Sequence, residues 1–323
     1  MSLALVEKHV ENPKSGGSWH LSGHNGDVLS IATSGSDVFA TCDVRGVGLL
    51  WKHHDLIHGV NRAYVGKIET GGPAIVDACF LHHTCLCTAQ GDGTVGVWNV
   101  ETAQQEQSLC RASGRGRSHD WPVINAVSAL NGTLLAYGGD DGFLVVGDPA
   151  QNGAAATTNL RVPIMSLATS KDSLYVGDVL GNIRCFDVRM MRSIYSFRGH
   201  HDPVSCVTLN KDLTMMVSYG MDNMLALWDV MPFALSTSSR LLHRIHMYQG
   251  DSQSLLRCGW SKKDTILVPT GEGHIVCVTA SLFGGTNVSL PVRHQKQPAQ
   301  CAVFLDDDVA VSSAGAELIL QRV

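Results

Sequence analysis

The densest group of metal-binding side chains in the sequence lies in the segment CFLHHTCLC at residues 79–87. Its three cysteines and two histidines are Cys79, His82, His83, Cys85 and Cys87. Structural zinc sites use these ligands, but in spaced pairs that can converge on a tetrahedron. Cys85 and Cys87 stand two apart and face the same way on a strand, whereas two adjacent histidines suit a turn. The spacing therefore favours core thiols beside an exposed His-His turn, and we expect neither a metal nor a cofactor.

The sequence offers no motif that would supply an active site. It contains no phosphate loop of the form GxxxxGK, no GxSxG nucleophile turn and no HExxH segment. We therefore expect a protein that is not an enzyme.

Two features between residues 111 and 123 are candidates for partner binding. Arg111, Arg115 and Arg117 alternate with Gly and Ser in RASGRGRS, which predicts a flexible, exposed loop that could bind phosphate. The alternative is a solvated linker, because this loop holds no aromatic side chain to stack on a base. Trp121 in SHDWPV could anchor a protein partner, since Trp is enriched in binding hot spots. Packing against a neighbouring part of the protein is the other interpretation.

A repeating unit must position these residues. A short alternating strand, a turn, a second strand, a Gly/Asp/Asn turn and a third strand that ends in a large residue recur along the chain. The equivalent end positions are Trp51, Trp98, Gly147, Phe186, Trp228, Val278 and Gln321. Their separations of 39 to 50 residues match a four-stranded propeller blade of ~40–45 residues. Seven copies predict seven blades.

Gly-His pairs open several copies, as in LSGHNGDV at residues 21–28 and FRGHHDPV at residues 197–204. With the tryptophans, they make almost the whole chain resemble the WD-repeat family of propellers. The resemblance implies that the His of the Gly-His turn, an Asp six residues before the Trp, and the Trp itself are joined by hydrogen bonds in each blade. Such residues tie the loops of a blade together, so their role is structural.

This implied network is complete in one blade only. The fifth blade keeps His200, Asp222 and Trp228. Partial sets remain in three others, as Asp92 and Trp98 in the second, His119 and Asp141 in the third, and His24 and Trp51 in the first. The Asp position holds Arg45, Leu180, Glu272 and Gly315 in the first, fourth, sixth and seventh blades. We expect the incomplete blades to be less stable, and the registers of blades six and seven stay open.

The ends of the repeat array predict how the ring closes. Val323 follows directly on the third strand of the last copy, whereas the apolar piece Ser18 to Leu21 precedes the first Gly-His turn. We expect this piece to supply the missing outer strand, because closing the ring removes unpaired edges. The expected fold is an all-β, seven-bladed WD-repeat β-propeller over residues 18–323, closed by an N-terminal strand and preceded by an extension at residues 1–17.

Composition limits the kinds of partner. A net charge of −5 and a pI near 6.3 argue against a chain that its overall charge would hold on nucleic acid. No apolar run approaches the roughly 18 residues that span a bilayer, and the first residues lack a signal peptide pattern. We expect a soluble, unsecreted protein with no membrane contact. Its ten cysteines are mostly scattered among apolar neighbours, which suits reduced thiols.

A more specific resemblance lies in YGMDNMLALWDVMPFA at residues 219–234, followed by LLRCGWS at residues 255–261. The order MDN, WDV, PFA and LLRC-W-S resembles the family of WD-repeat 40-kilodalton subunits of the spliceosomal U5 small nuclear ribonucleoprotein. Ordinary blade geometry requires neither PFA nor LLRC. The match extends to LSGHNGDV and to QGDGTVGVW at residues 90–98, while blades three, four, six and seven depart from the family pattern. A divergent member is implied.

The resemblance implies a non-catalytic, nuclear scaffold that supports pre-mRNA splicing. Such a subunit would be a monomer within the particle, bound to its large core protein near its GTPase and helicase, with RNA contact secondary. FDVR at residues 186–189 suggests a different function. It has the aromatic-Asp-x-Arg form by which WD-repeat substrate receptors of cullin-type ubiquitin ligases dock on their adaptor. The form is also common at the end of ordinary blades. A cullin substrate receptor and an mRNA export or processing propeller are therefore the alternatives.

Overall fold

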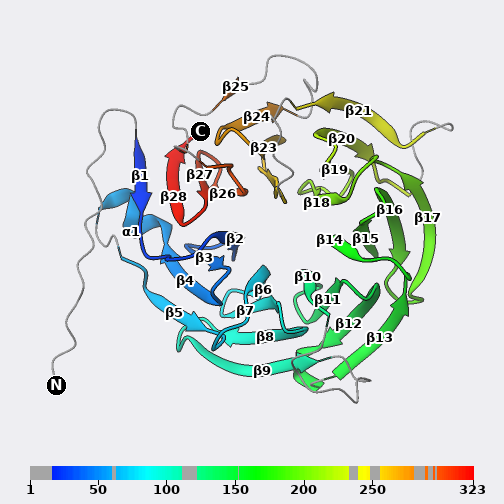
Figure 1. Ribbon diagram of the computed structural model, residues 1–323, viewed down its shortest axis with the longest axis horizontal. Coiled ribbons are helices and arrows are strands. Elements are labelled where there is room, and N and C mark those ends of the chain that lie inside the picture. Colours follow the sequence, from blue (N-terminus) through cyan, green and yellow to red (C-terminus); the bar gives the residue numbers. More distant parts are fainter. Residues whose placement is uncertain are drawn as a thin grey trace.

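Seven four-stranded antiparallel sheets stand around a central axis in the computed structural model, like the blades of a propeller (Figure 1). The structure describes residues 17–59, 63–110, 122–151, 153–232, 239–247, 255–279, 288–289, 294 and 297–323. The seven-bladed, all-β fold expected from the repeat is thus confirmed.

Each blade runs from an innermost strand at the axis to an outermost strand at the rim. The innermost strands are β2 (Val28–Thr33), β6 (Ile75–His82), β10 (Ile124–Leu130), β14 (Ile164–Thr169), β18 (Val204–Leu209), β22 (Gly259–Trp260) and β26 (Cys301–Asp306). The second strands are β3 (Val38–Asp43), β7 (Cys85–Gln90), β11 (Leu134–Gly139), β15 (Ser173–Asp178), β19 (Met215–Gly220), β23 (Thr265–Pro269) and β27 (Val309–Ala314). The third strands are β4 (Val47–Lys52), β8 (Thr94–Asn99), β12 (Phe143–Asp148), β16 (Asn182–Asp187), β20 (Met224–Asp229), β24 (Ile275–Thr279) and β28 (Glu317–Arg322). The outermost strands are β5 (Gly66–Glu69), β9 (Gln104–Cys110), β13 (Gly153–Asn159), β17 (Arg192–Arg198), β21 (Leu241–His246), β25 (Val288–Ser289) and β1 (Ser18–Leu21).

The core lies between the blades, because each sheet packs both of its faces against its neighbours. The second strands show this most clearly: every residue of β7, CLCTAQ, and of β27, VAVSSA, is buried. One apolar cluster joins Cys87 and Val97 of the second blade to Ile124 and Tyr137 of the third. Small and β-branched residues suit such positions, since they pack closely on a pleated surface. Burial of these faces holds neighbouring blades together.

The ring closes through the N-terminal strand. Strand β1 pairs antiparallel with β28, with Trp19 opposite Leu320 and Leu21 opposite Leu318. All four side chains are buried in one apolar cluster that the first and last blades share. The last blade therefore gets its outer strand from the other end of the chain, as the closing-strand expectation required.

The seven predicted end positions are structurally equivalent. Each lies opposite one residue on the second strand of its blade, which in chain order is Phe39, Leu86, Leu135, Leu174, Met216, Ile266 and Ala310. Blades six and seven thus have the same register as the others, although β22 and β25 of blade six are only two residues long. Within the described ranges, blade six has the shortest strands of the ring.

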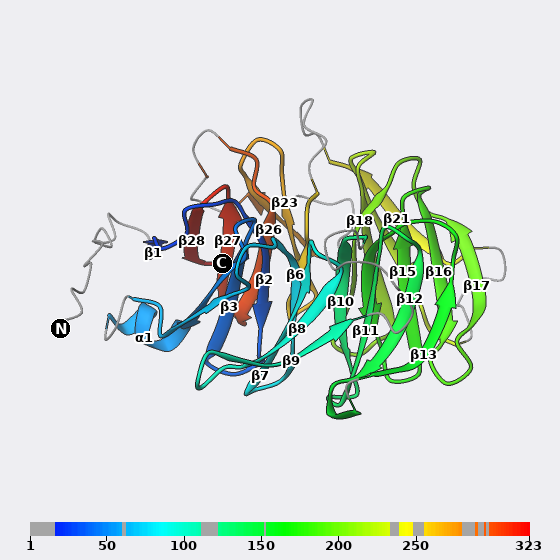
Figure 2. The ribbon, with the colours of Figure 1, turned by 60° about the horizontal axis from the view of Figure 1, so that its bottom comes forward.

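Helical structure in the described residues is confined to two short pieces. Helix α1 (His53–His58) lies outside the ring between β4 and β5 (Figure 2). A 3-10 turn occupies Pro149–Gln151. No helix in the described ranges is both long and apolar enough to cross a membrane.

Candidate functional site: blade networks and central channel

The fifth blade brings its three predicted residues into one hydrogen-bond network. The Nδ1 atom of His200 lies 3.0 Å from Oδ1 of Asp222, and its Nε2 atom lies 2.7 Å from Oγ of Ser218. The indole N–H of Trp228 donates to the same hydroxyl at 2.8 Å. Burial tends to raise the pKa of Asp222, but hydrogen bonds from His200 and from the backbone N–H of His201 hold this pKa below its usual value. The network ties the loop before β18 to the turn between β19 and β20.

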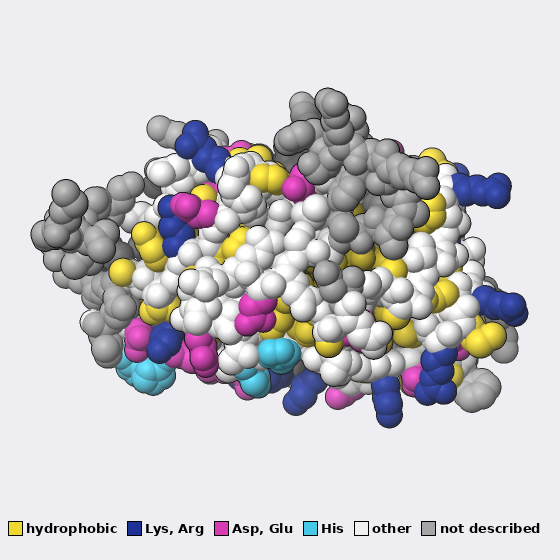
Figure 3. All heavy atoms as spheres, turned by 90° about the horizontal axis from the view of Figure 1, so that it is seen from below, with side chains coloured by type: hydrophobic (Ala, Val, Ile, Leu, Met, Phe, Trp, Pro, Cys, Tyr) yellow, Lys and Arg dark blue, Asp and Glu magenta, His cyan; other side chains and the backbone are white. Residues whose placement is uncertain are grey.

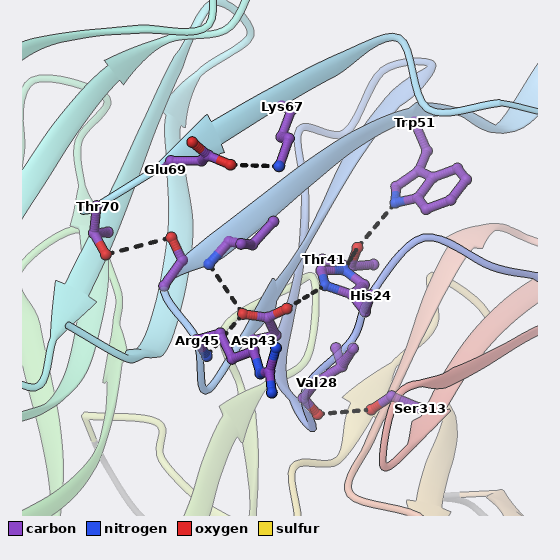
Figure 4. A network of polar contacts seen from close by, with 12 residues as sticks. His24, Val28, Thr41, Asp43, Arg45, Trp51, Lys67, Glu69, Thr70 and Ser313 are labelled. Carbon is purple, nitrogen blue, oxygen red and sulfur yellow. Dashed lines mark hydrogen bonds and ion pairs between the residues drawn. The ribbon is translucent and has the colours of Figure 1, made fainter. Parts of the chain in front are cut away.

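The first blade has the same network with its acid at another position (Figure 4). His24 lies 2.8 Å from Asp43 and 2.7 Å from the hydroxyl of Thr41, to which Trp51 donates at 2.9 Å. Arg45 stands at the position that Asp222 holds in blade five, yet Asp43, two residues earlier, performs the role of the acid. The Asp43 carboxylate also accepts the backbone N–H of Arg45 and of Val47, each at 2.9 Å. The network therefore survives the Arg45 replacement that the sequence suggested would break it.

In the second and third blades the predicted residues make hydrogen bonds to nearby residues of their own blade. Trp98 donates to the hydroxyl of Thr88 at 2.9 Å, while Asp92 accepts the hydroxyl and backbone N–H of Thr94 at 2.7 and 3.1 Å. In the third blade Asp141 accepts the backbone N–H of Phe143 at 3.0 Å. His119 lies outside the described residues. Asp92 and Asp141 thus stabilise the turns that follow their strands.

The seventh blade holds a network that the sequence analysis missed. His294 is fully buried, 2.9 Å from the hydroxyl of Ser312 and 3.1 Å from the carboxylate of Glu317. Burial lowers the pKa of His294, and Glu317 opposes this shift in part. No Gly precedes this His, but Ser312 follows it by 18 residues, the separation that also joins His200 to Ser218. That spacing is the signal by which the network could have been found.

In the fourth blade an aspartate makes a different set of contacts. Asp178 is buried at the end of β15 and accepts the backbone N–H of Leu180 and of Asn182, each at 2.9 Å. Arg184 on the next strand lies 3.3 Å from the same carboxylate. Leu180, which stands in the Asp position of this blade, is 55% exposed on the turn.

The four candidate partner-binding residues, Trp121, Arg111, Arg115 and Arg117, lie outside the described residues. The segment that ends in Arg189 is described: Phe186 is buried, and Asp187 accepts the backbone N–H of Arg189 at 2.8 Å. The Arg189 side chain is 79% exposed and lies 3.0 Å from Asp172. The FDVR segment therefore ends β16 with a turn and leaves its arginine at the surface.

The predicted cysteine and histidine group splits between core and surface. Cys85 and Cys87 are buried side by side on β7, and a hydrogen bond between their thiols holds the pKa of Cys85 below and that of Cys87 above the usual thiol value. His82 and His83 are exposed at the turn between β6 and β7. Over the described part of the chain, no group of three or more His, Cys, Asp or Glu side chains could hold a metal ion.

Side chains of all seven innermost strands or their flanks line a central channel, which contains a cavity of about 160 Å³. Arg257, from the LLRC segment just before β22, extends across it. Its guanidinium lies 2.8 Å from Asp77 on β6 of the second blade. It also donates to the backbone carbonyls of Val76 and Asn125 at 3.1 and 3.2 Å. Arg257 therefore joins the irregular sixth blade to the second and third blades on the other side of the axis.

Asp77 accepts hydrogen bonds from two further donors in the channel. The hydroxyl of Ser30 in the first blade donates to it at 3.1 Å, and the backbone N–H of Val127 in the third donates at 3.0 Å. Burial opposes the charge of Arg257, but Asp77 and neighbouring thiols hold its pKa above the usual value. These contacts form a charged, hydrogen-bonded bridge across the channel. Its residues come from four blades.

The comparisons with known proteins agree with this architecture. The family model of the WD domain, G-beta repeat, matches residues 191–229, which cover β17 to β20. The chain is 23% identical over 254 residues to Protein SPA1-RELATED 3 of Arabidopsis thaliana, covering 76% of this chain and 29% of that protein. It is 27% identical over 228 residues to Protein groucho of Drosophila melanogaster, covering 69% of this chain and 28% of that protein.

Fold and repeat match together support a WD-repeat protein. The chain corresponds to less than a third of the length of each of these two relatives. WD propellers suit the role of a protein-interaction scaffold and are generally non-catalytic, and the repeat match indicates no catalytic family. The finer assignment depends on the residues that distinguish one propeller from another.

Proposed function

We propose that this propeller is a non-catalytic protein-interaction scaffold of the spliceosomal U5 small nuclear ribonucleoprotein. One observation carries the proposal: MDN, WDV, PFA and LLRC-W-S follow one another between residues 221 and 261, as in the 40-kilodalton subunits of that particle. Generic propellers need no PFA or LLRC, so the ordered run is more specific than the fold. The proposed location is nuclear, and the proposed role is in pre-mRNA splicing.

The proposed partner is the large core protein of the particle, contacted through the loops of the ring, with the GTPase and helicase nearby. A rigid ring with many loops and a net charge of −5 fits protein contacts better than RNA contacts. RNA is therefore secondary in this proposal, and the protein is a monomer within the complex. Trp121 is its best anchor candidate.

Affinity purification from native extract tests the proposal. Tagged protein should co-purify U5 RNA and the large splicing proteins, and RNase should leave the protein partners bound. Trp121→Ala should weaken co-purification more than the combined change of Arg111, Arg115 and Arg117 to alanine. Met190→Ala, which shortens an apolar side chain that is 60% exposed, serves as the control.

Two results would contradict the proposal in different ways. A folded protein that enriches neither U5 RNA nor large splicing proteins would overturn the assignment to the particle. Release by RNase, or loss of association in the triple arginine variant alone, would instead show a tether through RNA, because phosphate contacts dominate such binding.

A cullin-type substrate receptor is the second candidate, and the exposed Arg189 favours it. Its guanidinium is at the surface at the end of a blade, where an adaptor could reach it. Co-purification of a cullin adaptor that Arg189→Ala abolishes, with Lys171→Ala as control, would favour this function over the first. An mRNA export or processing propeller would instead enrich mRNA and export proteins.

A further inference from the structure

Most thiols of this protein lie in its interior. Figure 3 shows the outer rim, over which charged, histidine and hydrophobic side chains are dispersed. Seven of the nine cysteines whose side chains the structure describes are buried. Three of these seven, Cys206, Cys258 and Cys301, line the cavity of about 160 Å³ in the central channel. Because one water molecule needs only about 10–15 Å³, a molecule as small as hydrogen peroxide has room beside these sulfur atoms.

Two of the channel thiols meet at the boundary between blades five and six. Cys206 belongs to β18, and Cys258 lies directly before β22 and next to Arg257. The backbone N–H of Cys258 donates to the sulfur of Cys206 at 3.3 Å, and this sulfur lies 3.8 Å from the carbonyl oxygen of Cys258. A hydrogen bond also joins the two thiols. Such proximity is what a disulfide between two cysteines requires.

The surroundings make the two thiols chemically unequal. Hydrogen bonds from the thiol and the backbone N–H of Cys258, together with the charge of Arg257, hold the pKa of Cys206 below its usual value despite burial. The pKa of Cys258 is raised, because its thiol proton is held by Cys206 and because it is buried. The thiolate is the nucleophilic form of cysteine. Cys206 is therefore the sulfur suited to attack an oxidant, and Cys258 is the sulfur placed to react next.

The close cysteine pairs of blade two lack one or other of these properties. Cys79 and Cys87 lie opposite each other on β6 and β7, but their surroundings raise the pKa of both thiols. Cys85 and Cys87 stand two positions apart on one strand, ~6.6 Å along it, whereas the Cβ atoms of a disulfide are ~3.5–4.5 Å apart. Contact between the two residues and a favoured thiolate coincide at Cys206 and Cys258.

We propose that Cys206 and Cys258 form a peroxide-sensitive dithiol, which oxidation converts into a disulfide between blades five and six. The thiolate of Cys206 attacks one oxygen of hydrogen peroxide: the S–O bond forms, the O–O bond breaks, and the departing hydroxide takes up a proton to become water. The sulfur of Cys258 then gives up its proton and attacks the sulfur of Cys206. The S–S bond forms, the S–O bond breaks, and a second water leaves.

This reaction is balanced by the peroxide alone. The two thiols are oxidised to one disulfide, and one hydrogen peroxide is reduced to two waters. The bond would tie the segment before the short strand β22 to β18, which lies 52 residues earlier in the chain. The inference holds whichever particle contains the protein.

Peptide mapping of the purified full-length protein tests the pair. The reduced protein is treated with hydrogen peroxide, its remaining thiols are alkylated, and it is digested with trypsin without reductant. Residues 199–211 and 258–262 each become a peptide with one cysteine, so a link between these peptides identifies the bond. We expect this linked pair and its loss after treatment with dithiothreitol.

The rate of oxidation separates a reactive pair from thiols that only fill space. Burial raises the pKa of Cys277 to about 11, and residues 264–293 give a tryptic peptide with this cysteine alone. Oxidation at Cys206 should be at least about tenfold faster than at Cys277, because the thiolate reacts and the thiol does not.

Single substitutions test the role of each sulfur. In Cys258→Ser the sulfenic acid should persist on Cys206, where dimedone traps it, because no second thiol remains to displace the oxygen. Cys206→Ser should abolish both the linked peptides and any trapping at Cys258. Cys301→Ser changes the third thiol of the same cavity and should leave the link unchanged, so it is the matched control. An unchanged melting temperature establishes that each variant is folded, and the map of the unsubstituted protein decides if one is not.

Three results would overturn the proposal. Equal rates of oxidation at Cys206 and Cys277 would show that the channel thiols only pack. A link from residues 258–262 to residues 297–322, which contain Cys301, would give Cys258 a different partner. Accumulation of sulfinic acid on Cys206 without any link would show that Cys258 does not react with the oxidised sulfur.

Discussion

Loss of the bridge between Arg257 and Asp77 across the channel should destabilise the whole ring. Arg257→Met keeps a long side chain but removes the guanidinium that joins blade six to Asp77. The aspartate would then retain only Ser30 and the backbone N–H of Val127 as donors. Removal of one partner from a buried ion pair costs ~3–5 kcal/mol.

The structure places the expected cost of Arg257→Met at the lower end of this range. The side chains of Arg257 and Asp77 are 18% and 12% exposed. Asp77 also keeps two hydrogen-bond donors, so its charge stays partly compensated. We expect a loss of about 3 kcal/mol in the free energy of unfolding. At ~2 °C per kcal/mol for a large domain, the melting temperature should fall by about 6 °C.

A double-mutant cycle and hydrogen exchange measure the effect. Asp77→Asn combined with Arg257→Met should cost at least ~1 kcal/mol less than the two single changes added together, because neither leaves the other's charge unpaired. Exchange should accelerate first in β22 to β24, which Arg257 holds to the opposite blades. Lys263→Met is the control: it breaks an exposed ion pair with Asp308 between blades six and seven and should change little.

Two outcomes would refute the reasoning. If Arg257→Met were as stable as Lys263→Met, the channel contacts would not hold blade six. If the costs of the two single variants simply added in the double variant, Arg257 and Asp77 would be uncoupled, and their 2.8 Å contact would contribute no pairwise stability.

Three further predictions concern the networks and the closure. Asp43→Ala should cost ~1–3 kcal/mol of unfolding free energy in denaturant titrations, because it leaves buried donors unpaired, whereas a comparable loss in Arg45→Ala would contradict the assignment of the acid. Folding lowers the pKa of Asp43 and Asp222 below their usual value, so the stability they contribute is complete above about pH 4 and is lost as the pH falls through the lowered values. Titrations across pH should show this loss, and it should be smaller in Asp222→Asn. Deletion of residues 1–22 should lower both melting temperature and solubility, since the last blade would lose β1; an unchanged melting temperature would show that closure is dispensable.

The repeat made the fold predictable because its signals are local. Alternation of apolar residues, a turn and a large residue at the end of the third strand specify one blade, and the next copy repeats them. Even Val278 and Gln321, where the large aromatic is lost, keep the strand register of Trp228. Packing between blades requires apolar faces in register, and many residue types satisfy it.

The networks were only partly predictable because they depend on where atoms converge. The WD-repeat resemblance implied an acid six residues before the Trp, but a carboxylate needs only to reach Nδ1 of the histidine. Asp43 does so from the end of its strand, and Glu317 does so with a longer side chain from the start of the next strand. The hydroxyl partner is more regular: Thr41, Thr88 and Ser218 each precede their Trp by ten residues.

The pairing of Arg257 with Asp77 had no local signal at all, because 180 residues separate the two and only the closed ring brings them together. This bears on the LLRC segment that carries part of the proposed function. Its arginine is used inside the channel, so this residue of the motif is explained by the fold and contacts no partner from there. Under the proposed function, partner contacts must therefore come from other parts of the chain, such as loops or edges. If the proposed association with U5 holds, its loss in Arg257→Met should accordingly follow loss of stability, whereas its loss in Trp121→Ala should occur at unchanged stability.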